Sequence, residues 1–150
     1  MLKILQEYLS VTFVSAALRQ EPPSLPLACA VLMFEILRAD REQHPAEWET
    51  VRRHITQAFS LDEKAAEDLM QAAKQHAEEA ISLHAFVREI NQAYEPEAKA
   101  ALVRMLWDVA YADGQLDPHE EYAIRKLADL LYVRHRDFIR GKHQAMPSED

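Results

Sequence analysis

Six carboxylates stand in two sets with one spacing, and they are the side chains of this sequence best suited to chemistry. Each member of the first set has a counterpart 73 residues later: Glu35 and Asp108, Asp40 and Asp113, Glu47 and Glu120. Clusters of carboxylate oxygens bind hard divalent cations such as Ca²⁺ and Mg²⁺. The pattern therefore predicts a divalent-cation site, with Ca²⁺, Mg²⁺ or Zn²⁺ as candidates, if the fold brings the two sets together.

Glu35 and Asp108 are the more informative pair, because each interrupts a run of apolar residues. An unpartnered buried carboxylate is costly, so each one needs a cation, a hydrogen-bond donor or access to water. Ion pairs offer a second explanation that the sequence leaves open. Glu35 can pair with Arg52, and Asp108 can pair with Arg125, which occupies the equivalent place.

The second acidic loop also has a purely structural interpretation. Asp117, Pro118 and Glu120 have the residue types of an N-cap, a first helical position and a third helical position, so they predict a helix start with or without an ion. An EF-hand is excluded, because Ile124 stands where such a loop needs its closing glutamate. Helix caps and ion pairs alone remain the alternative to a cation site.

Composition narrows the class of protein. The 150 residues carry 17 basic and 25 acidic side chains, a net charge of −8, and 49% of them are apolar. This balance fits a globular domain and argues against nucleic acid as a partner, because phosphates need cationic side chains to neutralise them. The single cysteine excludes a disulfide framework, and two glycines are too few for a phosphate-binding glycine loop. No apolar run reaches the length of a membrane span.

Apolar periodicity and helix start signals predict an all-α fold of about eight helices. We interpret Met1–Leu18 as a first core helix and not as a signal peptide, because Lys3 is its only basic residue. A cytoplasmic location is then the default. The other helices are expected at 27–37, from Pro45, after a capping box at Ser60–Glu63, after Ser82, from Pro96, from Pro118 and at about 135–145, with 146–150 as a tail.

The chain contains an internal repeat. At an offset of 73 residues, Leu27–Asp62 aligns with Ala100–His135. Each unit is an apolar helix, a short acidic loop and an amphipathic helix. Two such units, at about 25–62 and 98–135, predict a compact pseudo-symmetric bundle in which the two apolar helices touch and residues 1–150 form a single domain.

The second unit and the end of the chain resemble a known family. The loop Ala112-Asp113-Gly114-Gln115-Leu116-Asp117 between two helices, and the ending Asp137–Lys142, are similar to those of the tellurite-resistance TerB-like family. The resemblance covers nearly the whole chain and extends to the N-terminal helical domain of DjlA-type co-chaperones. It implies a compact all-helical cytoplasmic protein that is tied to metal or envelope stress and has no defined reaction.

We therefore expect a non-enzymatic TerB-like stress-response domain of the tellurite-resistance type, with a divalent cation at its paired acidic loops and no catalytic residue. The alternative is a protein-interaction or co-chaperone-like helical module without a metal. A protein partner is expected in both cases, a homodimer remains open, and neither nucleic acid nor a membrane span is expected. The metal ligands would come from Asp113, Glu120, Asp108, Asp40, Glu47 and Glu35.

The first acidic loop departs from the second at three positions. It has Arg41, Gln43 and His44 in place of Gly114, Leu116 and Asp117. A glycine just after a helix end commonly adopts the left-handed conformation, so we expect a positive φ at Gly114. An arginine at the same point is strained or follows another path, which leaves open whether the first loop forms an equivalent site.

Overall fold

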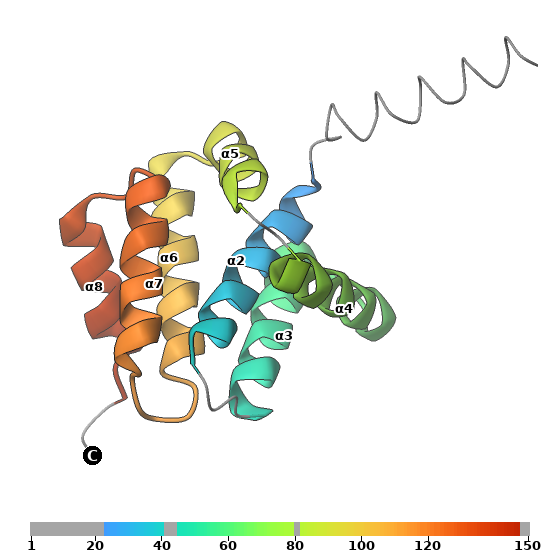
Figure 1. The fold of residues 1–150 in the computed structure, drawn as a ribbon, viewed down its shortest axis with the longest axis horizontal. Coiled ribbons are helices and arrows are strands. Elements are labelled where there is room, and N and C mark those ends of the chain that lie inside the picture. The colour runs from blue at the N-terminus through green and yellow to red at the C-terminus, as the bar shows by residue number, and fades with distance from the viewer. Residues whose placement is uncertain (1–22, 41–44, 80–81, 148–150) are drawn as a thin grey trace, which may run out of the picture.

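The computed structural model describes residues 23–40, 45–79 and 82–147 of the chain. These residues form seven α-helices and no strand (Figure 1): α2 Leu25–Ala39, α3 Pro45–Phe59, α4 Glu63–Glu79, α5 His84–Ala93, α6 Pro96–Ala110, α7 Pro118–Leu130 and α8 His135–Ala145. The predicted all-α class is confirmed. The expected first helix, Met1–Leu18, lies outside the described residues, as do Arg41, Gln43 and His44.

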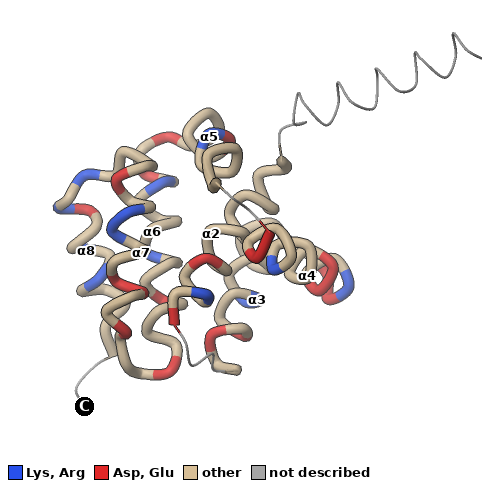
Figure 2. The backbone as a smooth tube through the Cα atoms, viewed as in Figure 1, with Lys and Arg blue, Asp and Glu red and all other residues tan. Residues whose placement is uncertain are grey.

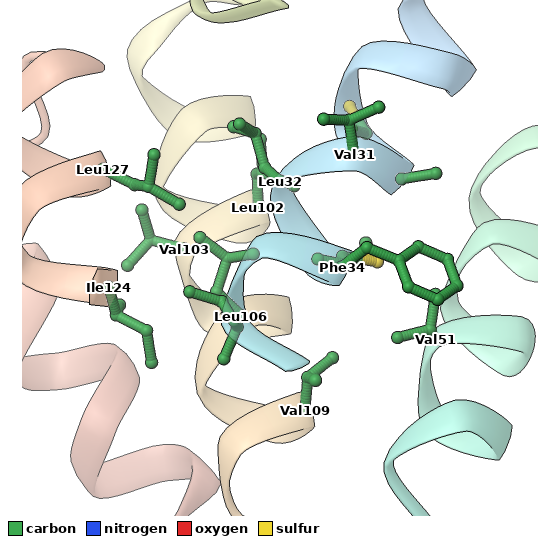
Figure 3. Close-up of a cluster of buried hydrophobic side chains, with 14 of the residues drawn as sticks. Val31, Leu32, Phe34, Val51, Leu102, Val103, Leu106, Val109, Ile124 and Leu127 are labelled. Atoms are coloured by element: carbon green, nitrogen blue, oxygen red, sulfur yellow. The ribbon is translucent and has the colours of Figure 1, made fainter. Parts of the chain in front are cut away.

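α2 and α6 lie at the centre of the bundle. From Ala28 to Phe34, no residue of α2 is more than 3% exposed, which agrees with its almost wholly apolar sequence. α2 packs directly against α6, and Leu32, Leu102 and Leu106 contribute to the buried cluster drawn in Figure 3. The predicted contact between the two apolar helices is confirmed.

The same helix contacts recur in both units. α2 packs on α3 and α4, and α6 packs in the same way on α7 and α8. The crossed contacts recur as well, because α2 packs on α7 while α6 packs on α3. Equivalent side chains are buried, as Val51 in α3 and Ile124 in α7 illustrate. Each repeat therefore contains three helices, one more than the sequence alignment included.

A glycine allows α8 to approach α6 closely. A Cβ atom on Gly141 would lie only 3.1 Å from Cδ1 of Trp107, which is tighter than ordinary van der Waals contact. Trp107 is fully buried, and its indole N–H donates a hydrogen bond to the backbone oxygen of Phe138 at 3.0 Å. The indole is thus fixed between the two helices, and a side chain at 141 would press against it unless Trp107 shifted by a few tenths of an ångström.

The start of α4 differs from the expected capping box. Ser60 has a φ of +52° and lies just after the end of α3, so it ends that helix and does not cap the next one. Asp62 is the capping residue of α4, because its carboxylate accepts a hydrogen bond from the backbone N–H of Ala65 at 2.7 Å. The prediction was wrong because serine is common at helix starts and no glycine marks the end of α3.

The ends of α3 and α7 have the same geometry. Ser60 and Tyr132 are the two non-glycine residues with positive φ in the described part of the chain, at +52° and +59°. In both cases the N–H of the next residue donates to a carbonyl five residues earlier, at 3.2 and 2.9 Å. This is the Schellman arrangement, in which glycine is the usual residue.

Candidate metal centre

The four helix ends that bear the acidic residues lie at one end of the molecule. α2 and α6 finish there, and α3 and α7 begin there (Figure 1). Figure 2 shows acidic positions at the end of α2, near the start of α3 and along the α6–α7 loop. Asp40 and Glu47 of the first set and Asp113 and Glu120 of the second set therefore lie at this end of the bundle.

The α6–α7 loop is held by its own hydrogen bonds. Gly114 has a φ of +87°, which confirms the predicted left-handed turn, and a carboxylate oxygen of Asp113 accepts from the N–H of Gln115 at 3.0 Å. Asp117 caps α7, because its carboxylate accepts from the N–H of His119 at 2.7 Å. The backbone N–H of His119 is also the largest cause of the lowered pKa of Asp117.

Glu47 and Glu120 occupy the same position in their helices and are both buried. Pro45 begins α3 and Pro118 begins α7, so each glutamate is the third residue of its helix. The two residues are 0% and 1% exposed, and no oxygen of either carboxylate has a hydrogen-bond partner in the part of the chain that the structure describes. The backbone of Asp117 is near enough to Glu120 to favour its charged form, but outside hydrogen-bond geometry.

The environment of both glutamates opposes ionisation. Burial, and after it the charges of Asp40, Asp113 and Asp117, raises the pKa of Glu47 to about 7. Burial raises the pKa of Glu120 to about 9, with Glu47 and Asp40 as the next causes. The pKa of each glutamate is thus raised in part by acidic residues of the other unit. A positive charge among them would relieve both causes.

The oxygens have a spacing that suits a cation. Asp40, Glu47 and Asp113 each offer a carboxylate oxygen, and these three oxygens lie within 4.8 Å of one another. Two ligands on opposite sides of a Ca²⁺ ion are about 4.8 Å apart, because each Ca–O distance is about 2.4 Å. The cluster contains neither histidine nor cysteine among the described residues, so its donor set is that of a hard cation rather than of zinc.

Asp108 and Glu35 do not join this cluster. Asp108 lies beside α3, with one oxygen 3.1 Å from Nε2 of His54 and the other 3.1 Å from Nε of Arg104. Burial would raise the pKa of Asp108, but the contacts with His54 and Arg104 outweigh it and lower the pKa. Glu35 lies 3.2 Å from Arg38, one turn along α2. Their interruption of the apolar runs is explained by ion pairs.

The partners of these ion pairs differ from the expected ones. Arg125 does not reach Asp108, and its guanidinium lies over the ring of Phe138, 5.6 Å from the centroid. Arg52 pairs with Glu67 of α4 rather than with Glu35. Both expectations assumed that each unit satisfies its own acid. Asp108 is instead reached from the other unit, by His54 of α3, which the sequence analysis did not single out.

The burial of the two glutamates had a signal in the sequence. Glu120 lies four residues before Ile124, and Glu47 lies four residues before Val51, so each glutamate shares a helix face with a fully buried residue. Residues four apart are neighbours on a helix surface. A buried apolar residue four positions later therefore indicates that a glutamate at this position is buried. A helix start by itself does not distinguish it from an exposed capping residue.

A comparison with known protein families decides the identity of the chain. The family model described as "Tellurite resistance protein TerB" matches residues 26–143, which includes all seven described helices except the first residue of α2 and the last two of α8. The chain belongs to the TerB family. No curated protein and no solved structure matches it significantly. The predicted likeness to the DjlA-type domain stays a prediction.

Proposed function

We propose that this TerB-family chain is a non-enzymatic stress-response domain of the tellurite-resistance type that holds a divalent cation between its two acidic loops. The observation that carries the proposal is the burial of Glu47 and Glu120 without hydrogen-bond partners. Two buried carboxylates that face each other are strongly unfavourable unless they are protonated or share a cation. Carboxylate oxygens of Asp40, Glu47 and Asp113 lie within 4.8 Å of one another, and Glu120, which feels the charges of all three, would be the fourth ligand.

The proposed ion is a hard one, with Ca²⁺ as the first choice. All four side chains offer carboxylate oxygens, and Ca²⁺ tolerates the flexible geometry and the high ligand number that such a cluster provides. Mg²⁺ demands a near-ideal octahedron and keeps several waters, so we expect weaker binding of Mg²⁺. Because the ligands come from both units, the ion would fasten the end of α2 and the start of α3 to the α6–α7 loop.

A protein-interaction or co-chaperone-like module without a metal is the second candidate function. Large apolar side chains on the surface favour it: Tyr122 is 71% exposed, Tyr132 is 80% exposed, and Leu130 and Met146 are also exposed. This candidate would gain most if the loop carboxylates were fully hydrogen-bonded, and Glu47 and Glu120 are not. We therefore assign the tyrosines to a protein partner of a cation-binding domain, with a second copy of the chain as one form of that partner.

The position of a surface pocket supports the absence of catalysis. A pocket of about 390 Å³ lies between α2, α5 and α7, where Leu83, Val87 and Leu127 form part of its wall. None of the four proposed ligands lines it. A carboxylic acid with a raised pKa acts as a catalyst only when a substrate can reach it. Glu47 and Glu120 are too deeply buried for that.

We also propose that residues 1–150 form one domain and that it acts in the cytoplasm. The two units share a central contact between α2 and α6, which supports a single core. Within the described ranges, no helix is both long and apolar enough to cross a membrane. The net charge of −8 favours a protein or a cation over nucleic acid as the partner.

Ion binding to the full chain, stripped of metal beforehand, tests the proposal. Calorimetric titration with CaCl₂, MgCl₂, MnCl₂ and ZnCl₂ should give one tightly bound Ca²⁺ per chain. Glu120→Gln, Glu47→Gln and Asp113→Asn should each weaken that binding by at least tenfold. Glu121→Gln is the matched control, because Glu121 is the next residue and pairs with Lys142 at 2.7 Å. If none of the four ions binds, or if Glu120→Gln binds as the parent does, the proposal is wrong.

A further inference from the structure

The outer face of α7 differs in chemistry from the equivalent face of α3. At the offset of 73, Tyr122 and Leu130 of α7 correspond to Glu49 and Gln57 of α3, and all four residues are exposed. The polar residues of α3 show that the fold does not require an apolar side chain at either position. Packing within the bundle therefore does not explain why α7 presents Tyr122 and Leu130 to the solvent.

A pocket adjoins this face of α7. It has a volume of about 390 Å³ and lies between α2, α5 and α7, with Val87, Leu127 and Leu130 among its apolar lining residues. Tyr122, Lys126 and Leu130 follow one another at a spacing of four, so they form a row along the helix, which we call the α7 row. A partner that lies along the α7 row would therefore reach the pocket as well.

The pocket carries an unpaired positive charge. Lys126, in the middle of the α7 row, lines the pocket, and no carboxylate of the described residues lies within ion-pair distance of it. Arg38 lines the opposite wall, but Glu35 already pairs with it at 3.2 Å. The first turn of α5, which also lines the pocket, contains no acidic residue. This surface is thus cationic on a chain whose net charge is −8.

We propose that the α7 row and the adjoining pocket bind an acidic amphipathic helix of another protein. Apolar side chains of that helix enter the pocket beside Leu127 and Leu130, and a carboxylate next to them pairs with Lys126. Amphipathic helices bind to grooves in this way, through apolar residues spaced three or four apart. Opposite charges at such a contact select the partner and its orientation. The proposal rests on the proposed function only in its need for a protein partner, and it does not depend on the cation.

A second copy of the chain fits this surface less well. In a two-fold symmetric dimer both copies use the same patch, so a contact of α7 with α7 brings two Lys126 ammonium groups together. Like charges that face each other oppose association. Glu35, the acidic residue of the pocket wall, is already paired and does not compensate them. A partner that brings its own carboxylates has no such repulsion.

Titration of the full chain with model peptides tests the chemistry of the partner. The probe is a fluorescently labelled helical peptide with three repeats of Leu-Glu-Ala-Leu-Glu-Ala-Gln, and its fluorescence anisotropy reports binding. We expect a dissociation constant below about 1 mM, which is typical of a small interface. Peptides with lysine for every glutamate, or with serine for every leucine, should bind at least about tenfold more weakly. No binding of the acidic peptide, or equal binding of all three peptides, would overturn the proposal.

Variants of α7 with a matched control on α3 test the location. Lys126→Glu should weaken binding of the acidic peptide by about tenfold or more. Arg53→Glu makes the same change of charge at the equivalent exposed position of α3, and should weaken it by less than about twofold. Leu130→Gln copies the residue of α3, so it should fold normally and weaken binding about fivefold. Parent-like binding by Lys126→Glu, or an equal loss in Arg53→Glu, would refute this location.

Chemical-shift mapping and solution mass distinguish this contact from the alternatives. The acidic peptide should shift the amide signals of Val87 and Leu127, and shifts confined to other helices would contradict the proposal. The titration is run in chelator and again in Ca²⁺, and binding in chelator supports this surface even if the chain binds no ion. The free chain should be a monomer by light scattering.

Two other occupants of the surface would each overturn the proposal. A dimer that Leu130→Gln converts to a monomer would mean that a second copy covers the α7 row. Phosphatidylglycerol vesicles that bind the parent but not Lys126→Glu would mean that the surface faces a lipid bilayer and not a protein.

Discussion

The chain leaves α2 and α6 in different conformations, yet each following helix carries the same buried glutamate. α2 ends at Ala39, and Asp40 leaves it in an extended conformation, with φ −90° and ψ 131°. α6 ends at Ala110, and the chain continues through a turn to Gly114 at φ +87°. The carboxylates of Glu47 and Glu120 are nevertheless both inaccessible. The feature that the units share is a helix that begins with proline, so the helix start and not the glycine loop determines where the glutamate lies.

The two carboxylates inside the apolar runs show the opposite behaviour. Asp108 is held by His54 of the other unit and by Arg104 of its own helix, whereas Glu35 has Arg38 beside it on the surface of α2. Equivalence in sequence therefore does not guarantee equivalence in chemistry. Two equivalent positions that face the opposite unit have the same environment only when the residues across the interface are also equivalent. This is not the case here, because His54, the partner of Asp108, aligns with Leu127.

The largest difference between the loops should appear in the stability of the metal-free protein. Burial raises the pKa of Glu120 to about 9 and that of Glu47 to about 7, so the folded state holds protons that the unfolded state releases near pH 4.5. Stability from these groups is present below about pH 4.5 and is lost as pH rises through the folded pKa values. At pH 8, Glu120→Gln should stabilise the metal-free protein by about 3 kcal/mol and Glu47→Gln by about 2 kcal/mol.

Urea unfolding at pH 8 and at pH 4 measures this effect. At pH 4 both glutamates are protonated in the folded and unfolded states, so the variants and the parent should agree to within about 0.5 kcal/mol. Glu121→Gln again serves as the control, because Glu121 is partly exposed and paired with Lys142. Variants that are no more stable than the parent at pH 8 would mean that the two glutamates tolerate their charges without a cation.

The ion pairs of Asp108 and Glu35 provide the second comparison. Asp108→Asn should cost about 1–2 kcal/mol, because it leaves His54 and Arg104 without their charged partner at a half-buried site. Glu35→Gln should cost less than about 0.5 kcal/mol, as expected for a pair between a partly exposed and an exposed side chain. Equal costs in urea unfolding would contradict the asymmetry of the two units.

Gly114 tests the path of the second loop. Gly114→Val should destabilise the protein by about 1–2 kcal/mol, because a β-branched residue is strained at a φ of +87°. No atom lies within 4 Å of a Cβ at this position, so the cost is a backbone cost and not a clash. Gly114→Asn should lose less than half as much, since asparagine tolerates the left-handed region. Thermal melts in which both variants behave as the parent would refute this.

The smallest expected effect concerns the matching ends of α3 and α7. Ser60→Gly and Tyr132→Gly should each stabilise the protein by about 0.5–1 kcal/mol, because each relieves a left-handed residue that has a side chain. The gain should be smaller for Tyr132, whose ring also lies 5.7 Å from the ammonium of Lys99. A loss of stability in both variants would show that these side chains make contacts that outweigh the strain.

The helices and the repeat were predictable because proline, capping residues and apolar spacing act locally. The starts at Pro45, Pro96 and Pro118 are observed as predicted, and α8 begins at His135. The left-handed Gly114 was also predictable from its place after a helix. The role of Ser60 in ending α3 was not predicted, because Ser60 adopts a left-handed conformation that is usual for glycine.

The composition of the site was harder to predict, since it depends on contacts between units. The sequence pointed to six carboxylates. The structure gathers Asp40, Glu47 and Asp113, with Glu120 near enough to feel their charges, while Asp108 and Glu35 lie in ion pairs elsewhere. Which acid faces which helix depends on the rotation of one unit against the other. No local pattern encodes that rotation, and so His54, the partner from across the interface, could not be named beforehand.

The most direct test of the cation site is a melt of the parent and of Glu120→Gln, each with chelator and with millimolar Ca²⁺, at pH 8. We predict that the order of the two melting temperatures reverses. Without the ion the variant should melt higher, and with it the parent should rise by about 5–10 °C while the variant stays unchanged and melts lower. A parent whose melting temperature is the same in Ca²⁺ and in chelator would contradict the central claim that the buried glutamates share a cation.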